Sequence, residues 1–280
     1  MTTYLADIVA AHRRSAAADG RDTDELLARA LEAPPARSFS EALLAAGRGA
    51  GKTRARGLAV IAEVKRRSPS KGLIAPDLDP AAVAAEYREG GAACLSVLTD
   101  EGFFAGSAFD LQAARRASGL PVLRKDFTVS RADVCDARLM GADAVLLIVA
   151  ALSPEELTTF HDLASRLGLD ALVEVHDEGE LELALDAGAR LVGVNQRDLT
   201  TFAVDQERAA RLAPRIPPEV VAVAESGIRG PDDARRIGEA GYDAVLVGEA
   251  VVTAPDRAEA VRALCGHRVS ARTPSAHAER

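Results

Sequence analysis

The apolar positions of the chain follow one repeated order, in which an Ala-rich helical pattern ends at Gly and a run of Val, Leu and Ile follows. The four clearest joins read GGAACLSVL (90–98), GADAVLLIV (141–149), GARLVGVN (188–195) and GYDAVLVGE (241–249). Gly supplies the left-handed residue that ends a helix, and a nearly continuous apolar run is typical of a parallel strand covered on both faces. Four more runs predict strands at LAVIAEVK (58–65), LPVLRKDF (120–127), LDALVEVH (169–176) and EVVAVAES (219–226).

Helical patterns alternate with the eight predicted strands, near residues 80–90, 108–118, 130–140, 153–167, 177–187, 204–212, 231–240 and 256–264. Eight strand–helix units in about 210 residues is the count of a TIM barrel, so we predict an α/β fold with a single (β/α)8 barrel over residues 58–266. A doubly wound open sheet is the main alternative, but the chain has no dinucleotide fingerprint after its first predicted strand.

Both ends of the chain lie outside the predicted barrel. Residues 1–57 are expected to form a helical extension, with two helices over 3–31 split by Ala18-Asp19-Gly20 and a short third one over 39–46. These helices would cover either the N-terminal mouth of the barrel or the side of its active face. Residues 267–280 are polar and aperiodic, which predicts a disordered tail.

The segment AGRGAGKT (46–53) is close to the phosphate-loop pattern G-x-x-x-x-G-K-[ST]. Ala46 stands at the first Gly position, however, and a helical pattern precedes it where the phosphate loop needs a strand. We therefore predict a flexible connector here.

Composition narrows the functional classes. The chain has 280 residues, of which 48% are hydrophobic and 27% charged, and its net charge of -8 argues against a nucleic-acid surface. No run is apolar enough for a membrane span and the N-terminus has no secretory pattern, so we expect a cytoplasmic protein. We also expect a monomer. Cys94, Cys135 and Cys265 have no metal-ligand spacing and are predicted to be buried apolar residues, so they indicate neither a disulfide framework nor a zinc site.

Charged and polar residues stand at the carboxyl ends of five predicted strands, the end at which barrel enzymes carry their active sites. They are Glu63 with Lys65, Lys125, Glu174, Asn195 and Glu225. Residues i and i+2 of a strand share a face, so Glu63 and Lys65 project together. For this pair alone, a structural salt bridge and a catalytic site are equally good interpretations. Two lysines and three acids at one mouth would perturb one another's pKa values, which favours proton transfer.

A phosphate site is predicted at the ends of the seventh and eighth strands. Ser226-Gly227 and Gly248 lie where barrel enzymes commonly bind phosphate through backbone N–H groups. The histidines sit mostly away from the strand ends, and we place His176 in a loop. The residues alone therefore indicate acid–base chemistry by Lys and Glu on an anionic sugar phosphate.

Seven ordered motifs, one per strand, resemble those of the indole-3-glycerol-phosphate synthase family. They are IAEVKRRSPSKG (61–72), LSVLTDEGFFAGS (95–107), LPVLRKDF (120–127), LVEVHDEGEL (172–181), VGVNQRDL (192–199), VAESGI (223–228) and AVLVGEAVV (244–252). So many ordered matches, over about residues 3–265, go beyond what a shared barrel supplies. The resemblance implies ring closure of 1-(o-carboxyphenylamino)-1-deoxyribulose 5-phosphate to indole-3-glycerol phosphate in tryptophan biosynthesis, with loss of carbon dioxide and water and without a cofactor or metal.

The resemblance also assigns roles to individual residues. Lys125 resembles the general acid that protonates the ketone oxygen, Glu174 the base of the later dehydration, and Lys65 the contact to the anthranilate carboxylate, able to exchange roles with Lys125. Glu63 and Asn195 match the residues that orient these groups and hold the ribulose hydroxyls. The remaining matches are Arg197 and Glu225 in support, Ser68, Ser226, Gly227, Gly248 and the backbone of Glu249 for phosphate, and Phe104, Phe127, Leu98 and Leu246 for the anthranilate ring.

Three positions depart from the family pattern. The loop after the second strand reads FFAGS in place of the more usual FFGGS, which predicts a stiffer loop. Gln196 stands where Asn or Ser is commoner, and Glu249 where some members have Ser, which leaves that phosphate contact to the backbone.

Three other functions are considered. A phosphoribosyl sugar isomerase needs an Asp or Cys acid–base pair at strand ends 1 and 5 or 6, which Glu63 with Lys65 does not match. A phosphate-binding scaffold would have lost the strand-end Lys and Glu, which are present. A duplicate synthase that acts on a modified anthranilate in a secondary pathway fits the same residues.

Overall fold

The computed structural model describes residues 4–47, 56–69 and 71–272. Its centre is a closed barrel of eight parallel strands, in which β10 pairs back onto β1. In order round the barrel they are β1 (Ala59–Val64), β4 (Cys94–Leu98), β5 (Val122–Lys125), β6 (Ala144–Ile148), β7 (Asp170–Val175), β8 (Leu191–Asn195), β9 (Val221–Glu225) and β10 (Ala244–Val247). The predicted (β/α)8 barrel is confirmed, and the open sheet is wrong because β1 is paired on both sides.

Side chains alternate between two apolar layers along each strand, which explains why nearly every strand position is apolar. In β1, Ile61 belongs to the cluster inside the barrel together with Leu123 and Leu172. Val60 and Ala62 belong instead to the cluster between the strands and the surrounding helices. The barrel interior is therefore a packed core, as the two-residue period of a strand requires.

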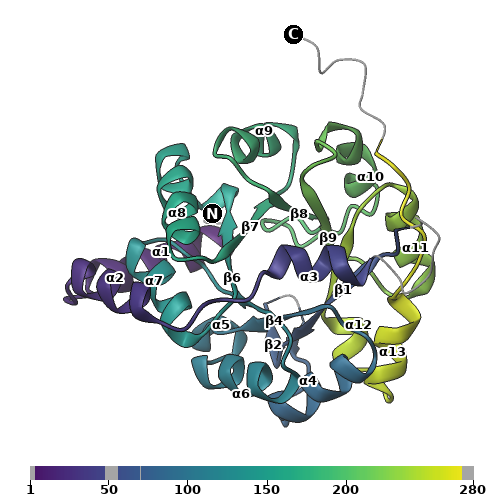
Figure 1. Cartoon of the computed structure of the whole chain (residues 1–280), viewed down its shortest axis with the longest axis horizontal. Coiled ribbons are helices and arrows are strands. Elements are labelled where there is room, and N and C mark those ends of the chain that lie inside the picture. The colour runs from purple at the N-terminus through teal and green to yellow at the C-terminus, as the bar shows by residue number, and fades with distance from the viewer. Residues whose placement is uncertain (1–3, 48–55, 70, 273–280) are drawn as a thin grey trace.

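Helices surround the barrel (Figure 1). Those that follow the strands are α4 (Pro80–Glu89), α6 (Ala108–Ser118), α7 (Arg131–Met140), α8 (Pro154–Arg166), α9 (Glu178–Asp186), α10 (Arg208–Leu212), α11 (Pro231–Glu239) and α13 (Arg257–Leu264). The sequence predicted all of these, although α10 begins later than expected because Arg197 and Val204 bridge in the loop before it. Short elements that it did not predict are α5 (Glu101–Phe104), α12 (Glu249–Val252), the hairpin of β2 (Arg67–Ser68) and β3 (Gly72–Leu73), and the 3-10 turns η1 (Val149–Ala151) and η2 (Ala213–Arg215).

The N-terminal helices cover both ends of the barrel. From α1 (Tyr4–Ala17), Tyr4 and Ile8 line a cavity at the carboxyl ends of the strands. At the opposite end, α3 (Phe39–Ala46) crosses the barrel (Figure 1), where Phe39 and Leu43 are buried in the interior cluster. The backbone N–H of Phe39 donates to Asp170 at the start of β7 across 2.7 Å. The remaining helix, α2 (Thr23–Glu32), packs beside α7.

Residues 267–272 return to the barrel. The backbone N–H of Leu58 donates to the carbonyl of His267 at 2.7 Å, and that of Val269 donates to the carbonyl of Arg56 at 2.8 Å. The buried Arg272 side chain pairs with Asp243 at 3.1 Å. The predicted disordered tail is therefore wrong for residues 267–272. Residues 273–280 lie outside the described residues, as do residues 48–53 of the predicted connector.

The burial of the cysteines and the lengths of the helices can be compared with the predictions. Cys94 and Cys135 are buried as predicted, whereas Cys265 is only partly buried, with its Sγ 3.5 Å from the carbonyl oxygen of Gly91. None of the helices in the described part of the chain is long and apolar enough to cross a membrane.

Candidate active site

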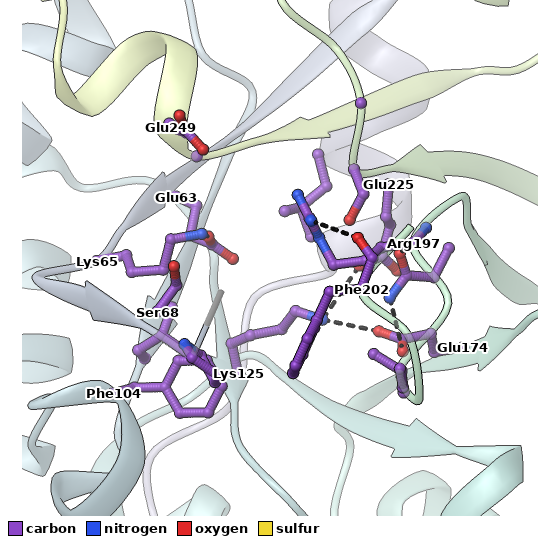
Figure 2. Close-up of a pocket in the computed structure, with 18 of the residues that line it drawn as sticks. Glu63, Lys65, Ser68, Phe104, Lys125, Glu174, Arg197, Phe202, Glu225 and Glu249 are labelled. Atoms are coloured by element: carbon purple, nitrogen blue, oxygen red, sulfur yellow. Dashed lines mark hydrogen bonds and ion pairs between the residues drawn. The ribbon is translucent and has the colours of Figure 1, made fainter. Parts of the chain in front are cut away.

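A cavity of about 920 Å³ opens at the carboxyl ends of the strands. It is lined by every residue that the sequence assigned to the site: Glu63, Lys65, Ser68, Leu98, Phe104, Lys125, Phe127, Glu174, Asn195, Arg197, Glu225, Ser226, Gly227, Leu246, Gly248 and Glu249. In Figure 2, Glu63, Lys65 and Ser68 lie on one side of the hollow and Glu174, Arg197 and Glu225 on the other. The closed barrel thus brings together side chains that are far apart in the sequence.

Lys125 lies at the centre of the charged groups. Its Nζ donates to Glu174 Oε2 at 2.8 Å and to Glu225 Oε2 at 3.1 Å. These carboxylates come from β7 and β9, two and four strands round the barrel from β5. Burial lowers the pKa of Lys125, but Glu174, Glu225 and Glu63 outweigh it and hold this pKa above the ordinary value. Lys125 is therefore protonated at neutral pH.

The two carboxyl groups that bind Lys125, those of Glu174 and Glu225, differ in their pKa values. Burial raises the pKa of Glu174, but the stronger combined effect of Lys125, His176 and the hydrogen bonds to Glu174 lowers it below the ordinary value. Burial raises the pKa of Glu225 to about 7, against the opposing charge of Lys125 and with the help of Glu174. Two carboxyl groups whose pKa values are shifted in opposite directions can act as a base and as a proton carrier.

Gly193 on β8 makes the space for the Glu225 carboxyl group. A Cβ atom at Gly193 would lie 2.1 Å from Glu225 Oε1. In the described structure this oxygen is buried and accepts no hydrogen bond. The space that Gly193 leaves could not be predicted from the sequence, because it depends on a side chain of the neighbouring strand.

Glu63 and Lys65 form both a salt bridge and one wall of the cavity. Lys65 Nζ donates to Glu63 Oε1, and the hydroxyl of Ser96 donates to Glu63 Oε2 at 3.4 Å. A Cβ atom at Gly248 would lie 2.4 Å from Glu63 Oε1, so any other residue here would displace this pair. The predicted salt bridge is therefore present within the cavity lining, and a catalytic role for this pair stays a prediction.

The turn after β9 is left-handed at two successive residues. Ser226 and Gly227 both adopt left-handed conformations, with φ of 64° and 75°. For Ser226 this conformation costs about 1–2 kcal/mol, a cost that proteins retain mainly at functional sites. Gln196 Nε2 donates to the carbonyl of Ser226 at 2.8 Å, and Gln206 Nε2 donates to that of Gly227 at 3.1 Å. The longer side chain of Gln196, noted as a departure, thus holds this turn.

The carboxylate of Glu249, the other departure from the family pattern at the predicted phosphate site, faces a lysine. Lys71 Nζ lies 3.3 Å from Glu249 Oε1, and both side chains are exposed. This ion pair links the loop after β1 to the start of α12. The negative charge of Glu249 is thereby partly neutralised beside Gly248.

Aromatic rings form the apolar part of the cavity. The ring centroids of Phe104 and Phe127 lie 6.4 Å apart, and His12 of α1 packs on Phe127 at 5.4 Å. Phe104 is carried by α5, whose first turn is capped by Asp100. Ala105 ends α5 in the left-handed region with φ of 55°, so the predicted stiff position in this loop is also a strained one.

One cluster of potential metal ligands occurs in the described part of the chain, formed by His12, Asp100 and Asp126. His12 Nε2 lies 2.9 Å from Asp100 Oδ2, whereas Asp100 Oδ1 accepts from the backbone of Phe103. Both oxygens of Asp126 also accept hydrogen bonds, from the backbone of Phe127 and from Thr99 and Arg124. Since protein donors already occupy these oxygens, we interpret the cluster as the attachment of α1 to the strand ends.

Sequence reasoning missed several contributions to the site. Tyr4 and Phe202 line the cavity from α1 and from the loop after β8. His176 lies in the loop directly after β7, as predicted, but the sequence did not indicate that its Nε2 lies 3.6 Å from Glu174 Oε1. Its spacing of four residues from Glu180, which binds its Nδ1 at 3.0 Å, was the available signal.

A strained left-handed turn, an apolar wall and a lysine between carboxyl groups of unequal pKa, all at the strand ends, indicate a class of protein. The chain is a (β/α)8-barrel enzyme suited to acid–base chemistry on a small phosphorylated molecule.

Comparison with known proteins gives the family. Residues 5–264 match the family model of indole-3-glycerol phosphate synthase. The chain is 50% identical to the enzyme of that name from Streptomyces griseus subsp. griseus over 85% of both chains. It is 48% identical to the one from Chlorobium luteolum over 91% of this chain and 95% of that one. The chain therefore belongs to the indole-3-glycerol phosphate synthase family, the carboxy-lyases of tryptophan biosynthesis.

Solved structures with similar folds are more distant in sequence. A thiamine phosphate pyrophosphorylase from Pyrococcus furiosus superposes with a TM-score of 0.56 at 21% identity, over 74% of this chain and 93% of that one. An N-acetylmannosamine-6-phosphate 2-epimerase from Clostridium perfringens gives 0.55 at 14% identity, over 69% and 86% of the two chains. At this identity the likeness concerns the fold alone.

Proposed function

We propose that the cavity closes the indole ring of 1-(o-carboxyphenylamino)-1-deoxyribulose 5-phosphate, releasing carbon dioxide and water and leaving indole-3-glycerol phosphate. The observation that carries the proposal is the position of Lys125 between Glu174 and Glu225, in a chain whose family bears this name. Lys125 is the general acid for the ketone oxygen, which becomes a hydroxyl as the aromatic carbon attacks. A raised pKa keeps the proton on Lys125 until that oxygen becomes basic.

Glu174 is the base of the later dehydration. Its lowered pKa keeps it ionised at neutral pH, and Asn195 Nδ2 donates to its Oε1 at 3.0 Å. Glu225, with its pKa near 7, can return a proton to Lys125 after the first step. Unequal acidities in one pocket thus support two successive proton transfers.

The two anionic ends of the substrate are assigned to different walls of the cavity. Lys65, with Glu63 beside it, binds the anthranilate carboxylate, and the rings of Phe104 and Phe127 hold the anthranilate ring. Glu63 and Asn195 hold the ribulose hydroxyls, with Arg197 in support. The phosphate is assigned to Ser68, Ser226, Gly227, Gly248 and the backbone of Glu249, and Leu98 and Leu246 extend the apolar wall.

The proposal extends to organisation and location. Residues 58–266 are the catalytic barrel and residues 1–57 an extension that contributes Tyr4 to the cavity. The protein is proposed to be a monomer that binds neither nucleic acid nor membrane, and its net charge of -8 argues against a nucleic-acid surface. Three free cysteines suit a reducing compartment such as the cytoplasm.

Turnover of the purified protein tests the proposal. We expect product with indole fluorescence from the unsubstituted substrate, without added metal. Product from a ring-substituted substrate only would identify the duplicate synthase of a secondary pathway instead. No product from either substrate would overturn the proposed function.

A further inference from the structure

His176 is held in one orientation by Glu180. The Nδ1 of its ring lies 3.0 Å from Glu180 Oε2, and the same oxygen accepts the backbone N–H of His176 at 2.7 Å. Glu180 lies on α9, directly behind the strand end, so both contacts are local to this turn. With Nδ1 bound in this way, the ring has its other nitrogen, Nε2, turned to the pocket side.

The Nε2 of His176 faces Glu174. It is buried, has no hydrogen-bond partner among the described residues and lies 3.6 Å from Glu174 Oε1. Its ring is largely buried, with 13% of the side chain exposed. Within the described residues, His176 is not part of the cavity lining, so it stands behind the carboxylate rather than against the substrate.

The carboxyl groups of the pocket share their lysines unequally. Lys65 pairs with Glu63, whereas Glu174 and Glu225 both bind Lys125. A protonated imidazole behind Glu174 would give this carboxylate a second cationic neighbour.

We propose that His176 is a positioning residue for the base: fixed by Glu180, it presents a charged Nε2–H to Glu174 and keeps that carboxylate ionised and turned into the pocket. This inference rests on the proposed function, in which Glu174 is the base. His176 acts through Glu174 and does not touch the reacting atoms.

The charged groups around both residues agree with this role. Burial lowers the pKa of His176, but Glu180 and Glu174 raise it above the ordinary value even though Arg208 of α10 opposes them. Glu174 in turn faces Lys125 of β5 and Asn195 of β8. The charges of Glu225 of β9 and Glu63 of β1 raise the pKa of the same Lys125. The His176 charge is present at low pH and is lost as the pH rises through its raised pKa.

The pH profile of the His176→Gln variant tests the proposal. We expect its acidic limb in kcat to move upward by on the order of one pH unit, with KM little changed and wild-type rates recovered at high pH. Glu180→Gln should move the limb in the same direction by less. The matched control is His161→Asn, which changes another partly buried histidine, on α8. A parallel fall of kcat at every pH, or an unchanged profile, would overturn the proposal.

A second measurement does not depend on turnover. Nitrogen-15 NMR of the imidazole in the full-length protein should give His176 a pKa above 6.5 in the wild type and a lower one in Glu180→Gln. An imidazole that stays neutral down to pH 6 in the wild type would contradict the charged form. If the wild type has no synthase activity but the NMR result holds, the proposed function fails while the His176–Glu174 contact stands.

Discussion

Lys125 and Glu174 are joined by a hydrogen bond of 2.8 Å although their strands, β5 and β7, are separated by β6. Glu225 binds the same ammonium from β9 across the barrel. The lysine is thus fixed by carboxylates from two directions, and its position depends on the closed ring of strands. A small change in strand register would separate these groups.

Replacement of Lys125 by Met should remove the general acid while keeping most of the side-chain volume. We expect kcat to fall by about 10³-fold, the usual size of such a contribution, with an unchanged circular dichroism spectrum. Arg116→Ala, which removes an exposed cation from α6, serves as the control and should keep its activity. Normal turnover by Lys125→Met would contradict the mechanism.

Glu225 should make the stability of the protein depend on pH. Its pKa is raised in the folded protein to about 7, against an ordinary value of 4.5, so the folded state holds a proton that the unfolded state releases between these values. Stability therefore falls as the pH rises from 4.5 to 7, by about 3 kcal/mol at most.

The Glu225→Gln variant should lack this slope. Its melting temperature, measured by calorimetry, is expected to exceed that of the wild type at pH 8 and to approach it at pH 5. Glu182→Gln on α9 removes an exposed carboxylate and should follow the wild type. Parallel curves for Glu225→Gln and the wild type would show that Glu225 is not protonated in this range.

Gln196 should affect phosphate binding more than chemistry. Gln196→Ala removes the hydrogen bond to the carbonyl of Ser226 and frees the left-handed turn. We expect KM and the inhibition constant of inorganic phosphate to rise by about 5-fold, because a net hydrogen bond contributes about 1 kcal/mol. Gln112→Ala on α6 is the control, and a fall in kcat alone would contradict this role.

Ala105 should be a position where Gly stabilises the protein. Ala105→Gly relieves a left-handed conformation that costs an L-residue about 1 kcal/mol, so the melting temperature should rise by a few degrees. The same replacement at Ala85, an exposed position within α4, should lower it because Gly is a poor helix former. If both variants are destabilised equally, the strain at Ala105 is absent.

Local patterns in the sequence predicted the barrel and the principal site residues. Apolar runs after Gly located the strands, and charges at their ends marked Glu63, Lys125 and Glu174, because a charged side chain is costly to bury unless partners surround it. The seven family motifs extended the prediction to the residues expected to contact the phosphate and the anthranilate ring. These signals are local, and each can be recognised within about ten residues of the chain.

Contacts between distant segments could not be predicted in the same way. Tyr4 reaches the cavity because of how α1 packs, and Gly193 is required because of the Glu225 side chain on the next strand. The polar segment 267–272 was predicted to be disordered, yet Arg272 pairs with the buried Asp243. A charged residue in a polar stretch gives no indication that its partner lies inside the fold.

The pairing of β1 with β10 has a consequence for how the chain acquires its structure. Ala59 pairs with Ala244, so one edge of the first strand has no neighbour until the last strand has been synthesised. During translation the growing sheet therefore carries an open edge, which is a site for aggregation. Closure of such a distant pair is intrinsically slow, and synthesis of the final βα unit sets the earliest time at which the ring can be complete.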